Sequence, residues 1–433
     1  MLKSVSRLRP AVALPAAALA ATLALAGCSS NNAGGSDDAP AATATDGQFK
    51  VDTAACDDPA AATKKIEGTW KIGYSAPLSG PVAGVVTYAL NGYKARIAAE
   101  NAAGGINGLK IEVSYKDDAY TPDKAKANAT QFLQSDKVDS LITFGSGPVG
   151  AIADDQNAAC VPLLYPSSSV QQYRDISQFP WTMQYLPAGD AEARYDRDVI
   201  LKRFPDGAKV GIAENQTASG KGYSNAFQAA AKGSKLEIAA IAPTTDPNAT
   251  ATQLKAAGVD VVYIAGITND CGPVVQAMAR VGFTPKMVLN PSNCADGTAY
   301  IAAGQAADGG VLPVYTKDPS DPALANDEGV KKYLSQVTTP DKNNTITVAG
   351  WTQADLTINT LKQAAASPSG LTHASVIEAA RNMTYASPML INGIKWVSTP
   401  TELVGMDAFQ TMVWSAADKR FKADGELIKI TGK

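Results

Sequence analysis

The stretch "WKIGYSAPLSGPVAGVVTYALN", residues 70–91, decides the fold. It begins as a strand-like apolar run, breaks into a loop of Pro, Ser, Gly and Ala, and continues with a helical pattern. In that pattern Val86, Leu90, Tyr93 and Ile97 recur at steps of four, three and four, which places them on one helix face. A strand, a loop of small residues and an amphipathic helix in this order predict the first unit of an α/β sheet.

The same alternation of strand-like and helix-like segments continues to about residue 314. Helical patterns separate the runs, an arrangement that builds parallel sheets flanked by helices. The strand-like runs are "KIGYSAP", "LKIEVSYKDD", "VDSLITFG", "VPLLYPS", "KVGIAEN", "KLEIAAIAP", "VDVVYIAG" and "KMVLNPS".

The N-terminus has the pattern of an export signal. Lys3, Arg7 and Arg9 precede an uncharged Ala/Leu-rich run that ends in "LAGC" at Cys28. This pattern predicts a signal peptide over residues 1–27 and lipidation of Cys28, which resembles the Cys of a bacterial lipobox. An ordinary export signal with an incidental Cys is the alternative. Residues 28–66 are small and polar at their start, and we expect them to form a flexible spacer.

The size and charge of the chain limit its class. About 365 residues follow the spacer, more than one hydrophobic core usually holds, so we expect two domains. The formal net charge is −3, and it becomes −6 when the three positive charges of residues 1–27 are removed. A mildly acidic chain without basic clusters argues against a nucleic-acid partner.

Four cysteines remain besides Cys28, an even number that outside the cytoplasm suggests two disulfides. Four cysteines allow three pairings. We favour Cys56 with Cys160 and Cys271 with Cys294, because the last two follow neighbouring strand-like runs. Free buried thiols are the alternative.

Several kinds of chemistry are missing. His373 is the only histidine, so neither a multi-histidine metal site nor a Ser-His pair with a second catalytic histidine can be built. We place His373 on the surface of a late helix. The Gly-containing loops lack the spacing of phosphate-binding motifs. We therefore expect no enzyme, no metal and no cofactor.

The loops at the predicted strand ends suit recognition of a small polar molecule. Backbone N–H groups at helix starts, helped by hydroxyls, can hold a carboxylate without a buried cation. Asp270 in "ITNDCG" could meet an ammonium group, or it could cap the helix that begins nearby. For Ser79 and Gly80, a tight turn without ligand contact is the alternative. The candidate ligand-binding residues are Ser79, Gly80, Ser146, Gly147, Ser167, Ser169, Thr217, Ser219 and Asp270.

The segments "KIGYSAPLSGPVAG" and "NGYKARIAAENAAGGINGLKIEVSYKDDAYTPDKA" resemble the type I periplasmic binding proteins of branched-chain amino acid importers. The resemblance places Ser146 and Gly147 in a carboxylate-binding loop, Ser167 and Ser169 in the next contact segment, and Asp270 opposite a ligand ammonium. A tyrosine common in the family is replaced near Ser219. This departure weakens the case for leucine, isoleucine or valine, so amides, urea, short-chain acids and aromatic acids remain open as ligands.

The resemblance implies a two-lobed α/β fold in which each lobe is a mainly parallel sheet flanked by helices. The chain would cross between the lobes three times. Lobe 1 would comprise residues 67–187 and 313–402, and lobe 2 residues 188–312 and 403–433. The ligand would bind in the cleft between the lobes.

The same resemblance implies the partners: an ABC permease with its ATPase, and the membrane, reached through the lipid on Cys28 at its extracytoplasmic face. We expect a monomer. A ligand-sensing lipoprotein that docks on a membrane receptor is the alternative function.

Overall fold

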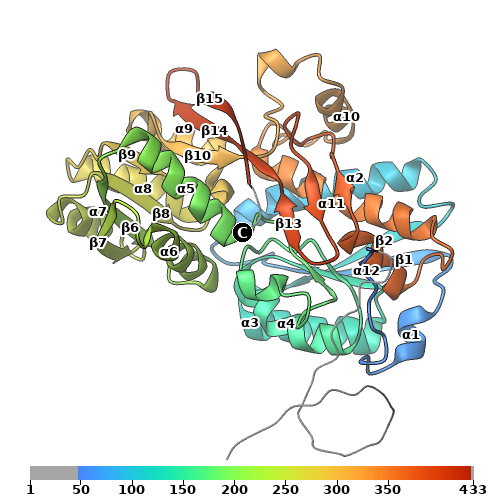
Figure 1. Ribbon diagram of the computed structural model, residues 1–433. Coiled ribbons are helices and arrows are strands. Elements are labelled where there is room, and N and C mark those ends of the chain that lie inside the picture. The colour runs from blue at the N-terminus through green and yellow to red at the C-terminus, as the bar shows by residue number, and fades with distance from the viewer. Residues whose placement is uncertain (1–46, 431–433) are drawn as a thin grey trace, which may run out of the picture. The chain divides into compact units, whose positions relative to one another are not determined.

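The computed structural model describes residues 47–430. The predicted signal segment 1–27 and Cys28 lie outside that range. Within it the chain forms two large sheets flanked by helices and one small sheet (Figure 1). We call the part built on the first sheet lobe 1 and the part built on the second sheet lobe 2.

The first sheet has five parallel strands in the order β2-β1-β3-β4-β5. They are β1 (Thr69–Ala76), β2 (Lys110–Asp117), β3 (Ser140–Thr143), β4 (Leu163–Leu164) and β5 (Thr182–Met183). Parallel strands need crossover helices, and here these are α2 (Ala83–Ala102), α3 (Pro122–Gln131) and α4 (Ser146–Ala158).

The helices of lobe 1 cover both faces of this sheet. One face packs on α3 and α4 through residues such as Phe132 and Ile152. The other packs on α2 and on α11 (Thr345–Ala365), and all four apolar residues predicted on one face of α2 are buried there. Three further helices complete the lobe: α1 (Pro59–Thr63), α10 (Glu328–Gln336) and α12 (His373–Arg381).

Helices α2 and α11 lie side by side at unusually close range (Figure 1). A Cβ built on Gly92 would lie 1.9 Å from the carbonyl oxygen of Thr347, and one on Gly350 would lie 1.8 Å from that of Ala89. Because no other residue fits such distances, these two glycines set how closely the backbones approach.

The second sheet has seven strands in the order β15-β14-β10-β9-β8-β6-β7. Strands β6 to β10 run parallel to one another. β14 pairs antiparallel with β10, and β15 pairs antiparallel with β14 and forms the edge of the sheet. The strands are β6 (Ala208–Glu214), β7 (Leu236–Pro243), β8 (Val261–Ala265), β9 (Met287–Leu289), β10 (Val311–Val314), β14 (Ala408–Ser415) and β15 (Arg420–Lys429). The helices of lobe 2 are α5 (Gly189–Arg203), α6 (Ala218–Ala231), α7 (Pro247–Ala256), α8 (Thr268–Arg280) and α9 (Gly297–Ala303).

A small antiparallel sheet belongs to lobe 1. Its strands are β11 (Thr384–Tyr385), β12 (Trp396–Ser398) and β13 (Leu403–Met406), and Trp396, Leu403 and Met406 enter the core of lobe 1. Short single turns complete the chain: η1 (Phe132–Asp136), η2 (Gln171–Arg174), η3 (Ser292–Cys294), η4 (Gly304–Ala307) and η5 (Pro322–Leu324).

The chain passes between the lobes three times. It leaves lobe 1 after β5 and enters α5, returns after β10, where Lys317 N–H donates to the Met389 carbonyl, and leaves again between β13 and β14. Arg174 binds two of these passages at once, because its guanidinium donates to the carbonyls of Leu186 and Leu403.

The predicted spacer is corrected in part. Residues 47–66 do not run free, because Phe49 is 2% exposed and exchanges two hydrogen bonds with the Asn382 side chain. Ile66 N–H donates to the Leu371 carbonyl, and α1 adds a helical turn. The low apolar content that predicts a spacer is found in residues 28–46, which lie outside the described range. In the segment that follows, Phe49 and Cys56 are enough to attach the chain to lobe 1.

The structure pairs the cysteines as the sequence favours. Cys56 is bonded to Cys160 with Cα atoms 5.5 Å apart, and Cys271 to Cys294 with Cα atoms 6.0 Å apart. The second bond joins the first turn of α8 to η3, two segments that meet at the cleft.

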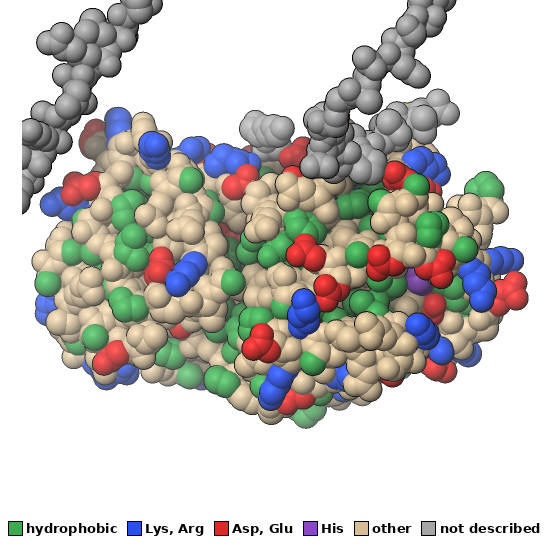
Figure 2. All heavy atoms as spheres, turned by 90° about the horizontal axis from the view of Figure 1, so that it is seen from below, with side chains coloured by type: hydrophobic (Ala, Val, Ile, Leu, Met, Phe, Trp, Pro, Cys, Tyr) green, Lys and Arg blue, Asp and Glu red, His purple; other side chains and the backbone are tan. Residues whose placement is uncertain are grey.

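Three observations bear on the surface. No helix within residues 47–430 combines the length and the apolar character needed to span a membrane. On the face shown in Figure 2, acidic and basic side chains are interspersed. His373, expected on the surface, is instead mostly covered, with its ring edge-on to Trp70.

Candidate functional site

A cavity lies between the two lobes and takes its walls from both. Its volume is about 80 Å³, counted as the space open to the centre of a water molecule. A water molecule needs roughly 10–15 Å³ of such space, so the cavity has room for about five to eight waters, or for one small organic molecule.

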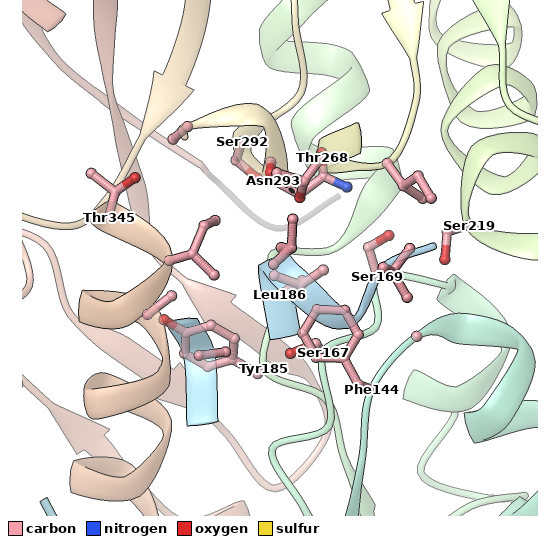
Figure 3. Close-up of a pocket in the computed structure, with 18 of the residues that line it drawn as sticks. Phe144, Ser167, Ser169, Tyr185, Leu186, Ser219, Thr268, Ser292, Asn293 and Thr345 are labelled. Atoms are coloured by element: carbon pink, nitrogen blue, oxygen red, sulfur yellow. Dashed lines mark hydrogen bonds between the residues drawn. The ribbon is translucent and has the colours of Figure 1, made fainter. Parts of the chain in front are cut away.

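The walls of the cavity are apolar and aromatic, with hydroxyl groups between them. Figure 3 shows Thr268, Ser292 and Asn293 on one side and Phe144, Ser167 and Tyr185 on the other. Five aromatic side chains line the cavity: Tyr120, Phe144, Tyr185, Tyr223 and Tyr315. Among the described residues, no Asp, Glu, Lys, Arg or His side chain lines it.

Hydrogen bonds close the two lobes over this cavity. Ser219 of lobe 2 accepts from Ser146 N–H of lobe 1 at 3.3 Å, and its hydroxyl lies 3.1 Å from the Ser146 hydroxyl. Asn269 Nδ2 donates to the Pro81 carbonyl at 2.8 Å. Asn344 Nδ2 donates to Asp296 Oδ1 at 3.0 Å. Contacts between the lobes on several sides of the cavity define a closed arrangement.

The predicted site residues divide into three groups. Ser167, Ser169 and Ser219 line the cavity. Ser146 is buried directly behind this wall, where it meets Ser219 and Ser168. The remaining five do not line the cavity: Ser79, Gly80, Gly147, Thr217 and Asp270.

The loop between β1 and α2 and the first turn of α2 reach the cavity through residues other than Ser79 and Gly80, the predicted ones. Val82 and Val85 line the wall. Ser79 turns away, because its hydroxyl and N–H donate to Asp117 at 2.6 and 3.1 Å. Gly80 makes the turn with φ +86°, a conformation that favours glycine.

Asp270 is held by its own lobe. Its carboxylate accepts from Asn215 Nδ2 at 2.9 Å, from Thr244 Oγ1 at 2.8 Å and from Ile267 N–H at 2.8 Å. The last bond ties the third residue of α8 to the residue before the helix, as in half of a capping box. Burial raises the pKa of Asp270, although these three bonds oppose the shift.

A second acid, which the sequence did not single out, lies behind the cavity wall. Glu192 on α5 is fully buried and accepts from Ser292 N–H at 2.6 Å and from Ser292 Oγ at 2.9 Å. Ser292 itself lines the cavity. Desolvation raises the pKa of Glu192 to about 7, against the effect of both Ser292 bonds. Asp196, one helical turn further, is also fully buried, and its pKa is raised well above the usual range, first by burial and then by Glu192.

The aromatic residues at the crossings were missed by the sequence analysis. Tyr185 precedes α5 and Tyr315 follows β10, and their ring centroids lie 6.1 Å apart. Tyr185 falls in the bridge "FPWTMQYLP", whose density of aromatic residues between two regular regions was the available signal. Thr345 and Gln353, from α11, were missed because α11 follows the regular alternation by a long stretch of sequence.

The comparisons with known proteins agree with this geometry. Residues 69–425 match the family model described as periplasmic binding protein. The chain belongs to the periplasmic binding protein family. Within it, the chain is 27% identical over 226 residues to an amino acid binding protein of Pseudomonas aeruginosa, a match that covers 51% of this chain and 59% of that protein, less than two thirds of its length.

Two solved structures share the fold. One is a branched-chain amino acid ABC transporter protein from Thermus thermophilus with bound valine, with a TM-score of 0.75 and 15% identity, covering 83% of this chain and 96% of that one. The other is a solute-binding protein of an ABC transporter from R. palustris in complex with benzoate, with a TM-score of 0.69 and 19% identity over the same shares. The fold is therefore the two-lobed α/β fold that the sequence predicts.

Proposed function

We propose that this protein is the solute-binding component of an ABC importer, and that it captures a small polar ligand, an amino acid or a related carboxylate or amide, in the cavity between its lobes. The observation that carries the proposal is the cavity itself. Both lobes supply its walls, and hydrogen bonds such as that from Ser146 N–H to Ser219 Oγ join the lobes beside it. Binding at such a place favours the closed arrangement of the lobes, which a permease can recognise.

A relative by sequence and two structural neighbours support this function. The Pseudomonas protein is named for amino acids, and the two solved neighbours hold valine and benzoate. Both ligands are small carboxylates with an apolar body. The cavity of this chain combines hydroxyls with aromatic walls, which suits that shared chemistry.

Within the cavity we assign the ligand contacts to Ser167, Ser169 and Ser219, with Ser146 positioning Ser219 from behind. Ser167 is already oriented, because its hydroxyl accepts from Gln353 Nε2 at 2.8 Å. The function that we propose is ligand binding with lobe closure, without catalysis.

Lipidation of Cys28 would hold the mature protein at the extracytoplasmic face of the membrane. In cells fed a radiolabelled fatty acid, the full chain should incorporate label and stay with the membrane fraction. The Cys28→Ala variant should lose both properties, and label retained by this variant would argue against the anchor.

The test of the main function is transport. A strain that lacks this protein should fail to accumulate the ligand found by mass spectrometry in the protein purified from cells, and the wild-type chain should restore uptake. Normal uptake in the deletion strain, together with tight binding by the protein, would favour the sensor function instead.

A further inference from the structure

The disulfide between Cys271 and Cys294 joins two segments of lobe 2 at the cavity wall. Cys271 lies in the first turn of α8, and Cys294 ends the single turn η3. Both side chains are buried. The residues next to the bond supply much of the lobe 2 wall: Ile267, Thr268, Asn269, Ser292, Asn293 and Ala295.

Each of the two segments also carries a hydrogen bond to lobe 1. Asn269, two residues before Cys271, donates to the Pro81 carbonyl at 2.8 Å, and we call this bond the α8 latch. Asp296, two residues after Cys294, accepts from Asn344 Nδ2 at 3.0 Å, and we call this bond the η3 latch. The disulfide therefore lies between two of the bonds that hold the lobes closed.

The lobe 1 partners of the two latches belong to one rigid pair of helices. Pro81 leads into α2, and Asn344 is the N-cap of α11. These helices approach backbone to backbone at Gly92 and Gly350, which fixes the spacing of the two partners. Lobe 2 can meet both partners at once only if its own two latch segments keep a matching spacing.

The other bonds between the latch segments are weaker than the disulfide. Thr268 Oγ1 donates to the Asn293 carbonyl at 2.8 Å, and Asn293 Nδ2 donates to the Gly266 carbonyl at 3.3 Å. Thr268 and Asn293 face the cavity side by side (Figure 3) and are partly exposed, so water competes for these bonds. A covalent bond has no such competitor. The three residues of η3 form one turn only, which needs an anchor to keep its place.

We propose that the Cys271–Cys294 disulfide is a positioning bond for lobe closure. It makes the α8 latch and the η3 latch parts of one body, so that the two latches form and break together. The inference rests on the proposed function for the role of closure. Its test needs no ligand, so the inference and the solute-binding function can fail separately.

The test breaks one latch and measures the segment that carries the other. Asn269→Asp removes the donor of the α8 latch, and an acid in the first turn suits that helix. Asn344→Asp removes the donor of the η3 latch and keeps a side-chain oxygen for Ile346 N–H, so the cap of α11 is preserved. Hydrogen–deuterium exchange of residues 29–433, followed by mass spectrometry, measures residues 267–272 and 292–297 separately.

With the disulfide intact, the effect of each variant should reach both segments. Asn344→Asp should speed exchange about fivefold in residues 267–272 as well as in residues 292–297, because one net hydrogen bond is worth roughly that factor. Asn269→Asp should give the same pattern from the other side. In the Cys271→Ala/Cys294→Ala background, each variant should speed exchange in its own segment and lose most of its effect on the other.

The second disulfide supplies the matched control. Cys56 and Cys160 lie away from the cavity wall, and their bond spans 104 residues against 23 for the other. Because it closes the longer loop, removing it in Cys56→Ala/Cys160→Ala should lower the melting temperature more. The transfer between the latches should nevertheless stay as in the wild type. If the disulfides only stabilised the fold, the transfer would instead fall along with the melting temperature in both double variants.

Three results would overturn the inference. Exchange that changes only in the substituted segment while the disulfide is intact would show that the latches act independently. Transfer that persists in Cys271→Ala/Cys294→Ala would assign the coupling to the bonds of Thr268 and Asn293. No change in either segment would show that the latches do not hold the lobes in solution, and it would leave the solute-binding function standing. The first and third results need only the intact disulfide, so they decide the matter even where the double variant does not fold.

Discussion

The two lobes differ in the partners of their buried acidic side chains. In lobe 1, Arg96 binds Asp355 at 2.8 Å and Glu100 at 3.0 Å, and Lys362 reaches Glu100 from the surface at 2.6 Å. In lobe 2, Glu192 accepts only from Ser292, and neither oxygen of Asp196 has a hydrogen-bond partner in the described part of the chain.

The contrast shows two solutions to the cost of burying a carboxyl group. Burial alone would raise the pKa of Glu100, but bonds from Lys362 and Arg96 bring it below the usual value, so this group is ionised at neutral pH. Glu192, with no cation beside it, titrates near pH 7. In lobe 1 the buried acids are therefore bound to a cation between α2 and α11, whereas in lobe 2 burial raises the pKa values of Glu192 and Asp196.

The largest effect should follow from breaking the lobe 1 network at its centre. Arg96→Met leaves Glu100 and Asp355 buried with much less compensation, and removing one partner of a buried ion pair costs about 3–5 kcal/mol. Urea unfolding at pH 7 measures this loss. A loss below about 1 kcal/mol would show that the two lobes do not differ in the way described.

Removing the acid of lobe 2 should change the pH dependence of stability. The pKa of Glu192 rises from 4.5 to about 7 on folding, which corresponds to about 3 kcal/mol. Because the folded pKa is the higher one, this stabilisation is complete below pH 4.5 and is lost as the pH rises through about 7. Glu192→Gln keeps a neutral group at that place, so it should lack most of this decline and be more stable than the wild type at pH 8.

Other titratable groups lie near Glu192 and can contribute to the pH dependence of stability, so control variants must separate their effects from that of Glu192. Asp196 has a raised pKa of its own, and burial likewise raises the pKa values of the surrounding tyrosines, Tyr195, Tyr223, Tyr263 and Tyr315. Because Glu192 contributes to the raised pKa of Asp196, the two carboxyls titrate as a pair, and Asp196→Asn should change the decline in a way that does not simply add to the effect of Glu192→Gln. Identical pH profiles for the wild type and Glu192→Gln would show that Glu192 is ionised in the folded protein.

Asp270 offers a smaller effect in lobe 2. Asp270→Ala strands the donors on Asn215, Thr244 and Ile267, and we expect a loss of about 2 kcal/mol in thermal or urea unfolding. Asp270→Asn should lose about half as much, because its amide oxygen can still accept. Unchanged stability together with lost amino acid binding in Asp270→Asn would restore the ammonium contact suggested by the sequence.

The smallest effect should come from the surface member of the lobe 1 network. The Lys362 side chain is 51% exposed, and exposed ion pairs contribute roughly 0–1 kcal/mol. Lys362→Met should therefore cost less than 1 kcal/mol and leave Glu100 bound to Arg96. A larger loss would mean that Lys362 is as important to Glu100 as the buried guanidinium.

The sequence predicted the parts of the fold that repeat. The parallel strands and crossover helices follow from local periodicity, as in α2, whose predicted face is buried. The antiparallel strands β14 and β15 and the small sheet lie beyond the regular alternation. β14 and β15 pair with each other across a short turn, and the strands of the small sheet pair with their neighbours in sequence, but β14 joins the second sheet by pairing with the distant strand β10, as in Val311 with Val413. Nothing local in β14 identifies β10 as its neighbour.

The site was predictable only where it coincides with strand-end loops. Ser167, Ser169 and Ser219 follow strands or begin helices, so topology places them at the cleft. Asp270 also lies between the end of a strand and the start of a helix. Its carboxylate, however, accepts hydrogen bonds from Asn215 and Thr244 at the ends of two other strands, and no single sequence motif reveals this. Tyr185 and Tyr315 reach the cavity because they lie on the crossings, a property of the folded chain.

The bond between Cys56 and Cys160 has a mechanical consequence. Residues 47–66 are attached to lobe 1 by this disulfide, by Phe49 and by the bond from Ile66 to Leu371, and no crossing lies between them and the first sheet. A force or a support applied to this segment is therefore transmitted to lobe 1 without passing through any of the three crossings between the lobes. If ligand binding closes the lobes as proposed, an electrode or sensor chip coupled at that end would hold lobe 1 fixed, and closure would move lobe 2 together with any reporter attached to it.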